Sequence, residues 1–164
     1  MFQSQTYGQQ NIEGVADKLK GFYDKTEEYD TPFQITIGTD SQNFDRTKVV
    51  SVIAAHREGH GGIFFYEVSN IPRITNVAHK LTEETSRSLT VATELAATLE
   101  SDKKYDLLRD SSIISIHIDA GWSDKGKTAE LIPNLVGWIR SCGYEAEVKP
   151  NSYAASSIAD KISK

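Results

Sequence analysis

The sequence predicts an α/β domain built on one mixed sheet, with antiparallel strands first and parallel strands after them. Three segments with strand-like patterns follow one another with short links, and helical and strand patterns then alternate to the end of the chain. The chain has 164 residues and is 38% hydrophobic, which suits one domain with a sizeable core. No internal repeat or low-complexity linker divides it, so we expect a single domain.

The first half of the chain predicts a helix and three antiparallel strands. In "NIEGVADKLKGFYDKTEE" the apolar residues recur three or four positions apart, as in an amphipathic helix. The segments "FQITIGTDSQ", "TKVVSVIAAHRE" and "GGIFFYEVSN" have strand-like patterns. Because the links "QNFDRT" and "EGHGG" are short, we expect each strand to pair antiparallel with the next.

The second half predicts helices that connect parallel strands. Residues 77–100 have a helical period, and "SSIISIHIDA" is a continuous apolar run, as expected of a strand buried on both faces. "TAELIPNLVGWIRSCG" reads as a helix in which Pro133 lies in the first turn or causes a kink. "YEAEVKP" predicts a last short strand and "SYAASSIADKISK" a closing helix. The result is a mixed five-stranded sheet with helices on both faces, plus the N-terminal helix.

Composition limits the classes of function. The formal net charge is −5, which argues against a non-specific nucleic-acid coat protein but less against an enzyme whose site is a group of carboxylates. The single Cys142 excludes an internal disulfide and a cysteine-pair zinc site. No apolar stretch reaches the roughly 20 residues that span a bilayer, and the N-terminus lacks the pattern of a signal peptide. We expect a cytoplasmic protein without a membrane partner.

Residues Gly121 to Thr128, "GWSDKGKT", match the phosphate-binding pattern G-x-x-x-x-G-K-[ST] and follow a predicted strand. A P-loop fold needs further parallel strands and a later acidic residue for Mg²⁺. Here only a short stretch follows, and antiparallel strands precede the match. The alternatives to a nucleotide-hydrolysing P-loop are a solvated turn, or contacts of Lys127 and the loop amides with a nucleic-acid phosphate.

Two aspartates stand at the ends of predicted strands. Asp40 closes "ITIGTD" and Asp119 closes "ISIHID". If these strands are parallel neighbours, both carboxylates emerge at one edge of the sheet, where α/β proteins often bind ligands. A hard divalent cation such as Mg²⁺ or Mn²⁺ is a natural partner for them. The alternative is that each aspartate only caps its turn.

The helical period selects Glu84 as a third candidate ligand. At about 100° per residue, Glu84 lies about 60° from Leu81, on the apolar side of the helix, whereas Glu83 and Glu94 point nearly opposite. A glutamate that faces the core is rarely buried without a partner. The alternative is an edge residue whose carboxylate reaches water.

These motifs resemble a known family. "IGTDSQ", "HIDAG…GKT" and "PNSYAASSIADK", in this order around a helix that carries a glutamate, are similar to the YkuK-like family of bacterial ribonuclease H-like proteins. The resemblance covers about residues 33–164 as the core and leaves residues 1–31 as an N-terminal helical extension.

The resemblance implies a ribonuclease H-like fold and two divalent metal ions, Mg²⁺ or Mn²⁺, held by four carboxylates. By this match Asp40 and Asp119 are the central ligands, Glu84 is the helix ligand and Asp160 is the last acid. A solvated helix face explains Asp160 as well, because it lies opposite two apolar residues of its helix, and Asp124 is a further acid within reach.

Other residues are candidates for substrate binding by position only. Ser41, Gln42, Lys127 and Lys161 are candidate phosphate or sugar contacts, with a plain polar surface role as the alternative. Two aromatic residues near the proposed site, Trp122 and Tyr153, are candidates for base stacking, and Trp138 is expected in the core.

Three hypotheses of function follow. The first is a metal-dependent nuclease that cleaves phosphodiester bonds in RNA, DNA or a hybrid by a two-metal mechanism. The second is a nucleic-acid-binding or assembly module on the same fold, and the third is a P-loop nucleotide hydrolase. The sequence does not distinguish among the nucleic-acid substrates or define the oligomeric state.

Overall fold

A computed structural model describes residues 1–26, 32–121, 125–149, 151, 158–159 and 161–164. The strands are β1 (Phe2–Ser4), β2 (Gly8–Gln10), β3 (Phe33–Asn43), β4 (Thr47–His56), β5 (Gly62–Ile71), β6 (Ser112–Gly121) and β7 (Glu145–Lys149). The helices with defined bounds are α1 (Ile12–Thr26), α2 (Val77–Glu100), the 3₁₀ helix η1 (Lys103–Tyr105), α3 (Asp106–Ser111) and α4 (Lys127–Ser141). None of the helices in these residues is long and apolar enough to cross a membrane.

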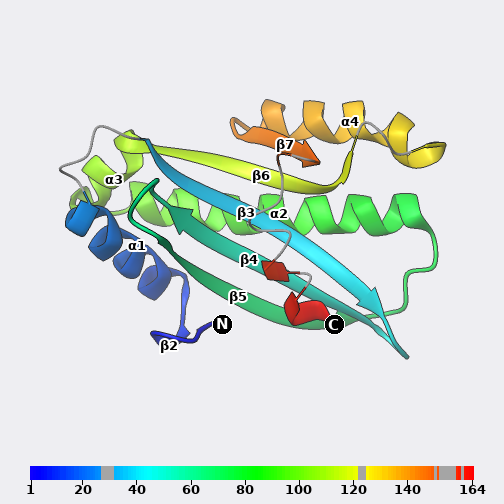
Figure 1. Ribbon diagram of the computed structural model, residues 1–164, viewed down its shortest axis with the longest axis horizontal. Coiled ribbons are helices and arrows are strands. Elements are labelled where there is room, and N and C mark those ends of the chain that lie inside the picture. The colour runs from blue at the N-terminus through cyan, green and yellow to red at the C-terminus, as the bar shows by residue number, and fades with distance from the viewer. Residues whose placement is uncertain (27–31, 122–124, 150, 152–157, 160) are drawn as a thin grey trace.

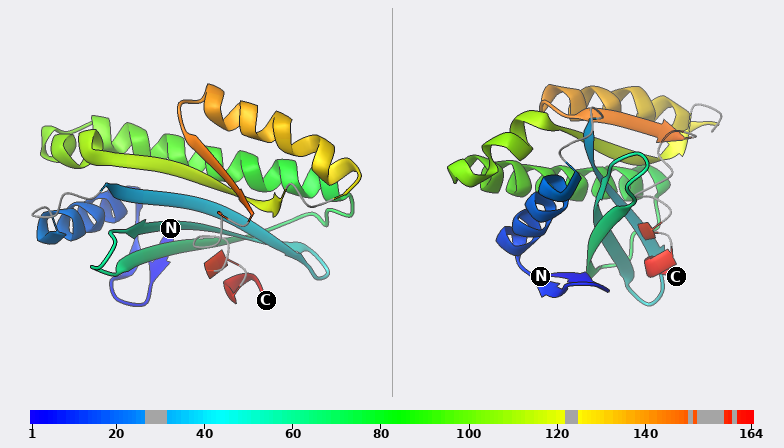
Figure 2. Two further views of the ribbon diagram at one scale, coloured as in Figure 1. Left: turned by 45° about the horizontal axis from the view of Figure 1, so that its top comes forward. Right: turned by 60° about the vertical axis from the view of Figure 1, so that its left-hand side comes forward.

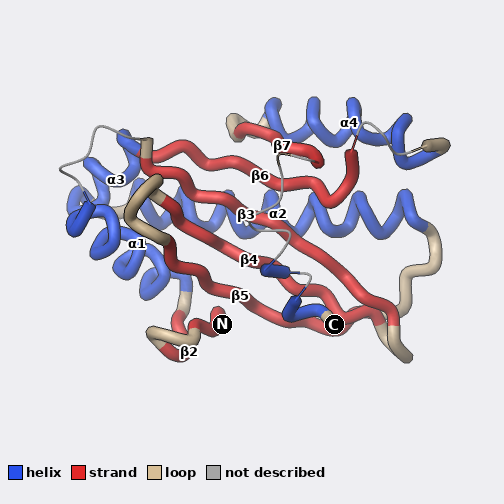
Figure 3. Tube along the Cα trace, in the orientation of Figure 1, coloured by secondary structure: helices blue, strands red, loops and turns tan. Residues whose placement is uncertain are grey.

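The strands form one mixed sheet in the order β2-β1-β5-β4-β3-β6-β7 (Figure 3). β3 and β5 pair antiparallel with β4, whereas β3 and β7 pair parallel with β6. The mixed α/β class is confirmed, but the expected number of five strands was wrong, because the described chain contains seven. The two missed strands have only three residues each, and β1 is held by pairing with β2 and with the edge of β5.

One face of the sheet carries the main core, under α1, α2 and α4. Figure 2 shows α2 and α4 on the same side of the sheet. Helix α2 begins after Asn76, whose side chain accepts a hydrogen bond from the backbone N–H of His79 at 3.0 Å. The α1 side chains Val15 and Leu19 are fully buried in this same cluster. The N-terminal helix is therefore an integral part of the core.

The opposite face of the sheet is covered by the C-terminal residues. Val50, Val52 and Ala54 of β4 pack against Ala159, which is fully buried. Residues 158–159 and 161–163 are helical and lie in front of the sheet in Figure 1. Helical elements thus pack on both faces, although among the described residues the second cover is smaller than the first.

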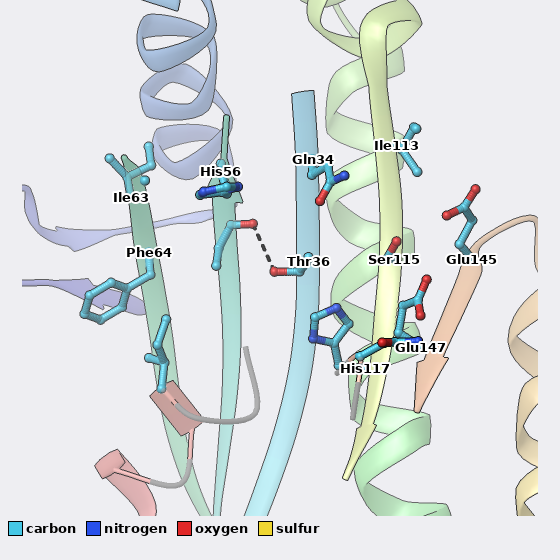
Figure 4. A pocket seen from close by; sticks show the side chains of 15 residues that line it. Gln34, Thr36, His56, Ile63, Phe64, Ile113, Ser115, His117, Glu145 and Glu147 are labelled. Atoms are coloured by element: carbon cyan, nitrogen blue, oxygen red, sulfur yellow. Dashed lines mark hydrogen bonds between the residues drawn. The ribbon is translucent and has the colours of Figure 1, made fainter. Parts of the chain in front are cut away.

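A hollow of about 590 Å³ remains on this second face, between β5 and β7 (Figure 4). Ser115 and Ile113 of β6 line it, and Ile113 is 37% exposed. The expectation that β6 is buried on both faces was therefore wrong for the first half of this strand.

The helix after β6 also differs in detail from the expectation. Pro133 lies inside α4, in its second turn, rather than in the first. Trp138 was expected in the core, but its side chain is 37% exposed. The core side of α4 is made instead by Ile132, Leu135, Val136 and Ile139.

Candidate carboxylate site

The parallel pairing of β3 with β6 places Asp40 and Asp119 at the same edge of the sheet. The last paired residues are Gly38 and His117, and each aspartate lies two residues beyond its strand's paired residue. Because side chains alternate along a strand, both carboxyl groups point to the same face as those two residues. The expected adjacency of these strands is confirmed.

Asp40 is a buried carboxyl group with a hydroxyl partner. Its side chain is 5% exposed, and the Ser163 hydroxyl donates a hydrogen bond to it at 2.9 Å. Burial raises the pKa of the Asp40 carboxyl, and the negative charge of Asp119 raises it further. The hydrogen bonds from Ser163 and the Ser41 backbone, and the positive charge of Lys80, act in the opposite direction.

Glu84 reaches the same region from α2. It is 6% exposed, so the prediction that this glutamate faces the sheet is confirmed. The Ser41 hydroxyl donates a hydrogen bond to Glu84 Oε1 at 2.6 Å. Burial raises the pKa of Glu84 to about 8, with contributions from the charges of Asp40 and Asp119. In this arrangement Glu84 is mostly protonated at neutral pH.

Asp119 is more accessible, and it forms an ion pair. Its side chain is 28% exposed, and its Oδ1 lies 2.8 Å from the ammonium group of Lys149 on β7. The β6–β7 register shifts between His117 and Gly121, and irregularities of this kind often occur beside functional sites. A Cβ atom on Gly121 would stand 3.0 Å from the Lys149 Cβ, so glycine permits the close approach of β7.

Lys80, Lys149 and Ser163 contact or influence these acids, and the sequence reasoning missed all three. Lys80 precedes Glu84 by four residues, so the helical period could have shown that the two side chains share one face of the helix. Lys149 ends the strand that neighbours β6, a fact that becomes visible only with the sheet order. Ser163 lies 123 residues from Asp40, and no local pattern connects them.

The proposed substrate contacts lie in different environments. Ser41 is 1% exposed, and its hydroxyl is engaged with Glu84. Gln42 is half-buried next to it, whereas Lys127 at the start of α4 and Lys161 are exposed. Four other candidates lie outside the described residues: Trp122, Asp124, Tyr153 and Asp160.

The segment that matches the phosphate-binding pattern joins β6 to α4. Gly126 precedes the helix with a φ of 70°, which favours glycine, and Lys127 is the first helical residue. The expected strand–loop–helix context is present. In the described sheet only β3 with β6, and β6 with β7, are neighbours that pair in parallel, so the larger run of parallel pairs that P-loop folds use is absent from it.

The three carboxyl groups are suitable donors for a metal ion, but in this structure they are not arranged as a metal site. They supply hard oxygen donors, and burial and mutual repulsion raise the pKa of two of them, a cost that a cation would relieve. Within the described part of the chain, no three acidic, histidine or cysteine side chains are placed so that they could hold a metal ion together. Ser163, Ser41 and Lys149 each engage a different one of these carboxyl groups.

Comparison with known proteins supports the class that the fold indicates. The family described as "Ribonuclease H-like" matches residues 14–164, so the chain belongs to the ribonuclease H-like family. This match includes most of α1, which the sequence resemblance left outside the core.

One similar protein is bacterial and has a similar length. The chain is 29% identical over 174 residues to "Uncharacterized protein YkuK" of Bacillus subtilis (strain 168), and the alignment covers 100% of this chain and 97% of that protein. The resemblance to YkuK-like proteins is confirmed.

Two solved structures of the Mos1 transposase catalytic domain, with raltegravir and Mn or Mg, are also similar, at 14% identity and TM-scores of 0.34 and 0.33. The matched part covers 90% of this chain but only 62% and 63% of those chains. A likeness this low does not bear on function.

Proposed function

We propose that the protein is a divalent-metal-dependent nuclease that hydrolyses phosphodiester bonds in nucleic acid. Membership of the ribonuclease H-like family supports this proposal. The observation that carries it is electrostatic: the charge of Asp119 on β6 raises the pKa of both Asp40 on β3 and Glu84 on α2. The three carboxyl groups, which come from separate elements, thus repel one another electrostatically, and this repulsion costs free energy unless a cation compensates for it.

In this proposal Asp40, Glu84 and Asp119 hold Mg²⁺ or Mn²⁺, with Asp160 as a fourth ligand and two ions as the expected number. The bound metal would lower the pKa of a water molecule and stabilise the charge that develops on the phosphate. A carboxylate ligand must be ionised, so Glu84 would lose its proton on binding.

The surrounding side chains would orient the carboxyl groups. The Ser163 and Ser41 hydroxyls each donate to one carboxyl oxygen, of Asp40 and Glu84 respectively, and so restrict how that carboxyl group turns. Burial of these two acids also excludes bulk water, which strengthens electrostatic interactions within the site. Ser41 is in this view a positioning residue.

The test is cleavage of four labelled substrates: single-stranded RNA, RNA–DNA hybrid, duplex DNA and a four-way junction, each with Mg²⁺ or Mn²⁺. We expect metal-dependent cleavage of at least one substrate. Asp40→Asn should reduce it more than about 100-fold, since even a change to an outer partner of a metal ligand costs about 10–100-fold. Glu83→Gln is the matched control, because Glu83 is next to Glu84 in the chain but pairs with Arg87, which contacts Ser69 of β5. Cleavage that survives Asp40→Asn would contradict the assignment of the site.

A second candidate, a non-catalytic nucleic-acid-binding module, is favoured by one observation. Each of the three carboxyl groups already has its own hydroxyl or ammonium partner. This function predicts no cleavage with either metal, and binding that Asp40→Asn leaves intact or improves. Measuring the binding of the same substrates to both proteins in EDTA separates the two functions.

A further inference from the structure

The hairpin that joins β3 to β4 carries an exposed aromatic side chain next to the carboxylate site. Phe44, in the turn that follows β3, is 56% exposed. This turn projects from the lower right of the sheet in Figure 1, at the end of β3 that also carries Asp40. A single exposed aromatic residue needs no explanation by itself. The residues around Phe44 distinguish it from an ordinary exposed aromatic residue.

The backbone around Phe44 is held in place by side chains of the neighbouring loop. Asn43 donates from its side-chain amide to the Ile74 carbonyl at 2.8 Å, and the Ile74 backbone N–H donates to the Thr47 hydroxyl at 2.9 Å. Arg73 donates to the Phe44 carbonyl at 3.0 Å. The hairpin turn is thus tied to the connection between β5 and α2. A ring presented on a fixed backbone loses less conformational entropy on binding a flat partner.

Positive charge is concentrated around this ring. Arg46 and Arg73 are exposed, and each donates to a backbone carbonyl. Neither has a carboxylate within ion-pair distance among the described residues. Asp45 is the one acidic residue in the turn itself. In a chain with a net charge of −5, this local excess of arginine points to an anionic partner.

The position of the ring suits a strand that also reaches the carboxylates. Phe44 lies four residues beyond Asp40, which corresponds to about 13 Å of extended chain. Lys80 opposes the rise that burial causes in the pKa of both Asp40 and Glu84, so its positive charge lies near these two acids. A phosphate backbone that passes from the site to the turn would therefore find Lys80 near the acids and Arg46 and Arg73 at the turn.

We propose that Phe44, with Arg46 and Arg73, forms a docking surface for single-stranded nucleic acid beside the carboxylate site. The ring stacks on an unpaired base, and the two guanidinium groups bind neighbouring phosphates. Stacking on an aromatic side chain together with phosphate contacts is the general mode of single-strand binding, and it is tolerant of sequence. The path of the nucleic-acid strand from this surface to the carboxyl groups rests on the proposed nuclease function. The surface adds to that function a substrate class, single-stranded nucleic acid.

The experiment measures binding of a fluorescein-labelled 12-nucleotide oligo(dT) and oligo(U), and of a blunt DNA duplex, by anisotropy in EDTA. Phe44→Ala should weaken single-strand binding about tenfold or more, because stacking of one base contributes this much to affinity. Blunt-duplex binding should change little. Leu107→Ala is the matched control, since Leu107 is 68% exposed on α3, far along the chain from the turn.

Replacing the arginines should change the salt dependence of binding as well as the affinity. Arg46→Ala and Arg73→Ala should each lower affinity and reduce the slope of log affinity against log salt concentration by about 0.7, the value for one single-strand phosphate contact. Unchanged affinity and salt slope in all three variants would overturn the docking surface. A loss equal for single strand and duplex would also overturn the stacking role.

The outcomes separate this surface from the nuclease. Phe44-dependent single-strand binding without cleavage by any metal would support the surface and remove the nuclease. Cleavage abolished by Asp40→Asn, with binding unaffected by Phe44→Ala, would support the nuclease and remove the surface.

Discussion

At the scale of single residues, the site consists of three carboxyl groups with three different partners. Asp40 accepts from Ser163, Glu84 accepts from Ser41, and Asp119 pairs with Lys149. The first two are almost completely buried, so their chemistry is governed by desolvation, whereas the third remains open to solvent. The burial of Glu84 and the ion pair of Asp119 each lead to a measurable prediction.

Glu84→Gln should stabilise the metal-free protein at high pH. In the unfolded chain the carboxyl ionises near its usual pKa of 4.5, but in the folded protein burial raises the pKa to about 8. The free energy of unfolding therefore falls as pH rises from about 4.5 to about 8, because the unfolded state has released a proton that the folded state retains. Glutamine removes this loss and still accepts from Ser41.

We expect Glu84→Gln to be more stable than the wild type by a few kcal/mol at pH 8, since one pKa unit corresponds to about 1.4 kcal/mol. The two proteins should be nearly equal at pH 4. Urea unfolding in EDTA at pH 4, 6 and 8 measures this, with Glu83→Gln as the control. Equal stability of Glu84→Gln and wild type at pH 8 would show that Glu84 is not desolvated.

Lys149→Met should strengthen metal binding, if the proposed ligands are correct. The Lys149 ammonium group occupies one oxygen of Asp119, so an arriving cation must displace it. The side chain of Lys149 is 57% exposed, and its removal should not unfold the protein. We expect an Mn²⁺ dissociation constant several-fold lower, corresponding to about 1 kcal/mol for a partly exposed ion pair.

Isothermal titration with Mn²⁺ checks this prediction. Lys103→Met is the control, because Lys103 is an exposed lysine beyond the opposite end of α2 from Glu84. Weaker Mn²⁺ binding by Lys149→Met would instead mean that Lys149 supports the ion's site rather than competes with it.

At the scale of elements, α2 links the core to the site. One face of this helix buries Leu89, Leu95 and Leu99 against the sheet, and the same face carries Glu84 near its beginning. The buried Ser88 hydroxyl meets Thr39 of β3 at 2.8 Å, so the helix is also fixed by a polar contact close to Asp40. The position of Glu84 therefore depends on the packing of the whole helix.

Leu95→Ala should destabilise the protein by about 2–5 kcal/mol, because it leaves a cavity in the core. Leu95 is fully buried, whereas Thr93 on the same helix is exposed. Thr93→Ala should stay within about 0.5 kcal/mol of the wild type. Urea unfolding at pH 7 measures both, and a loss below 1 kcal/mol for Leu95→Ala would contradict the packing of α2.

At the scale of the whole molecule, the two outer strands of the N-terminal hairpin protect the edge of β5. β1 pairs with β5 at Gln3 and Tyr66, and Phe2 is 3% exposed within the main core. An unprotected strand edge is a template for pairing with another chain. The small hairpin therefore has a structural role despite its short strands.

Deletion of residues 1–10 should promote self-association through β5. We expect a concentration-dependent increase in mass by light scattering, relative to the full chain at the same concentrations. Phe2→Ala, which weakens the packing but keeps the β1 backbone in place, should increase association less. Identical masses for the deletion and the full chain would show that β1 does not protect this edge.

The sequence by itself determined the elements that depend on local periodicity. The helix at 77–100 was predicted with the bounds that the structure has, and the central strands to within a few residues, because hydrophobic periods of two and 3.6 residues report local backbone geometry. The same period placed Glu84 toward the sheet. The strands β1 and β2 were missed, because a strand of three residues is too short to show a period.

The tertiary structure alone decided how these residues act on one another. Ser163 and Lys149 reach the acids from the last residues and from a neighbouring strand, and the hollow beside β6 is lined by residues of five different strands. The pKa of Glu84 depends on burial and on the charges of residues from other elements. Periodicity is a local property of the chain, whereas desolvation and charge coupling depend on distances in space that only the folded arrangement sets.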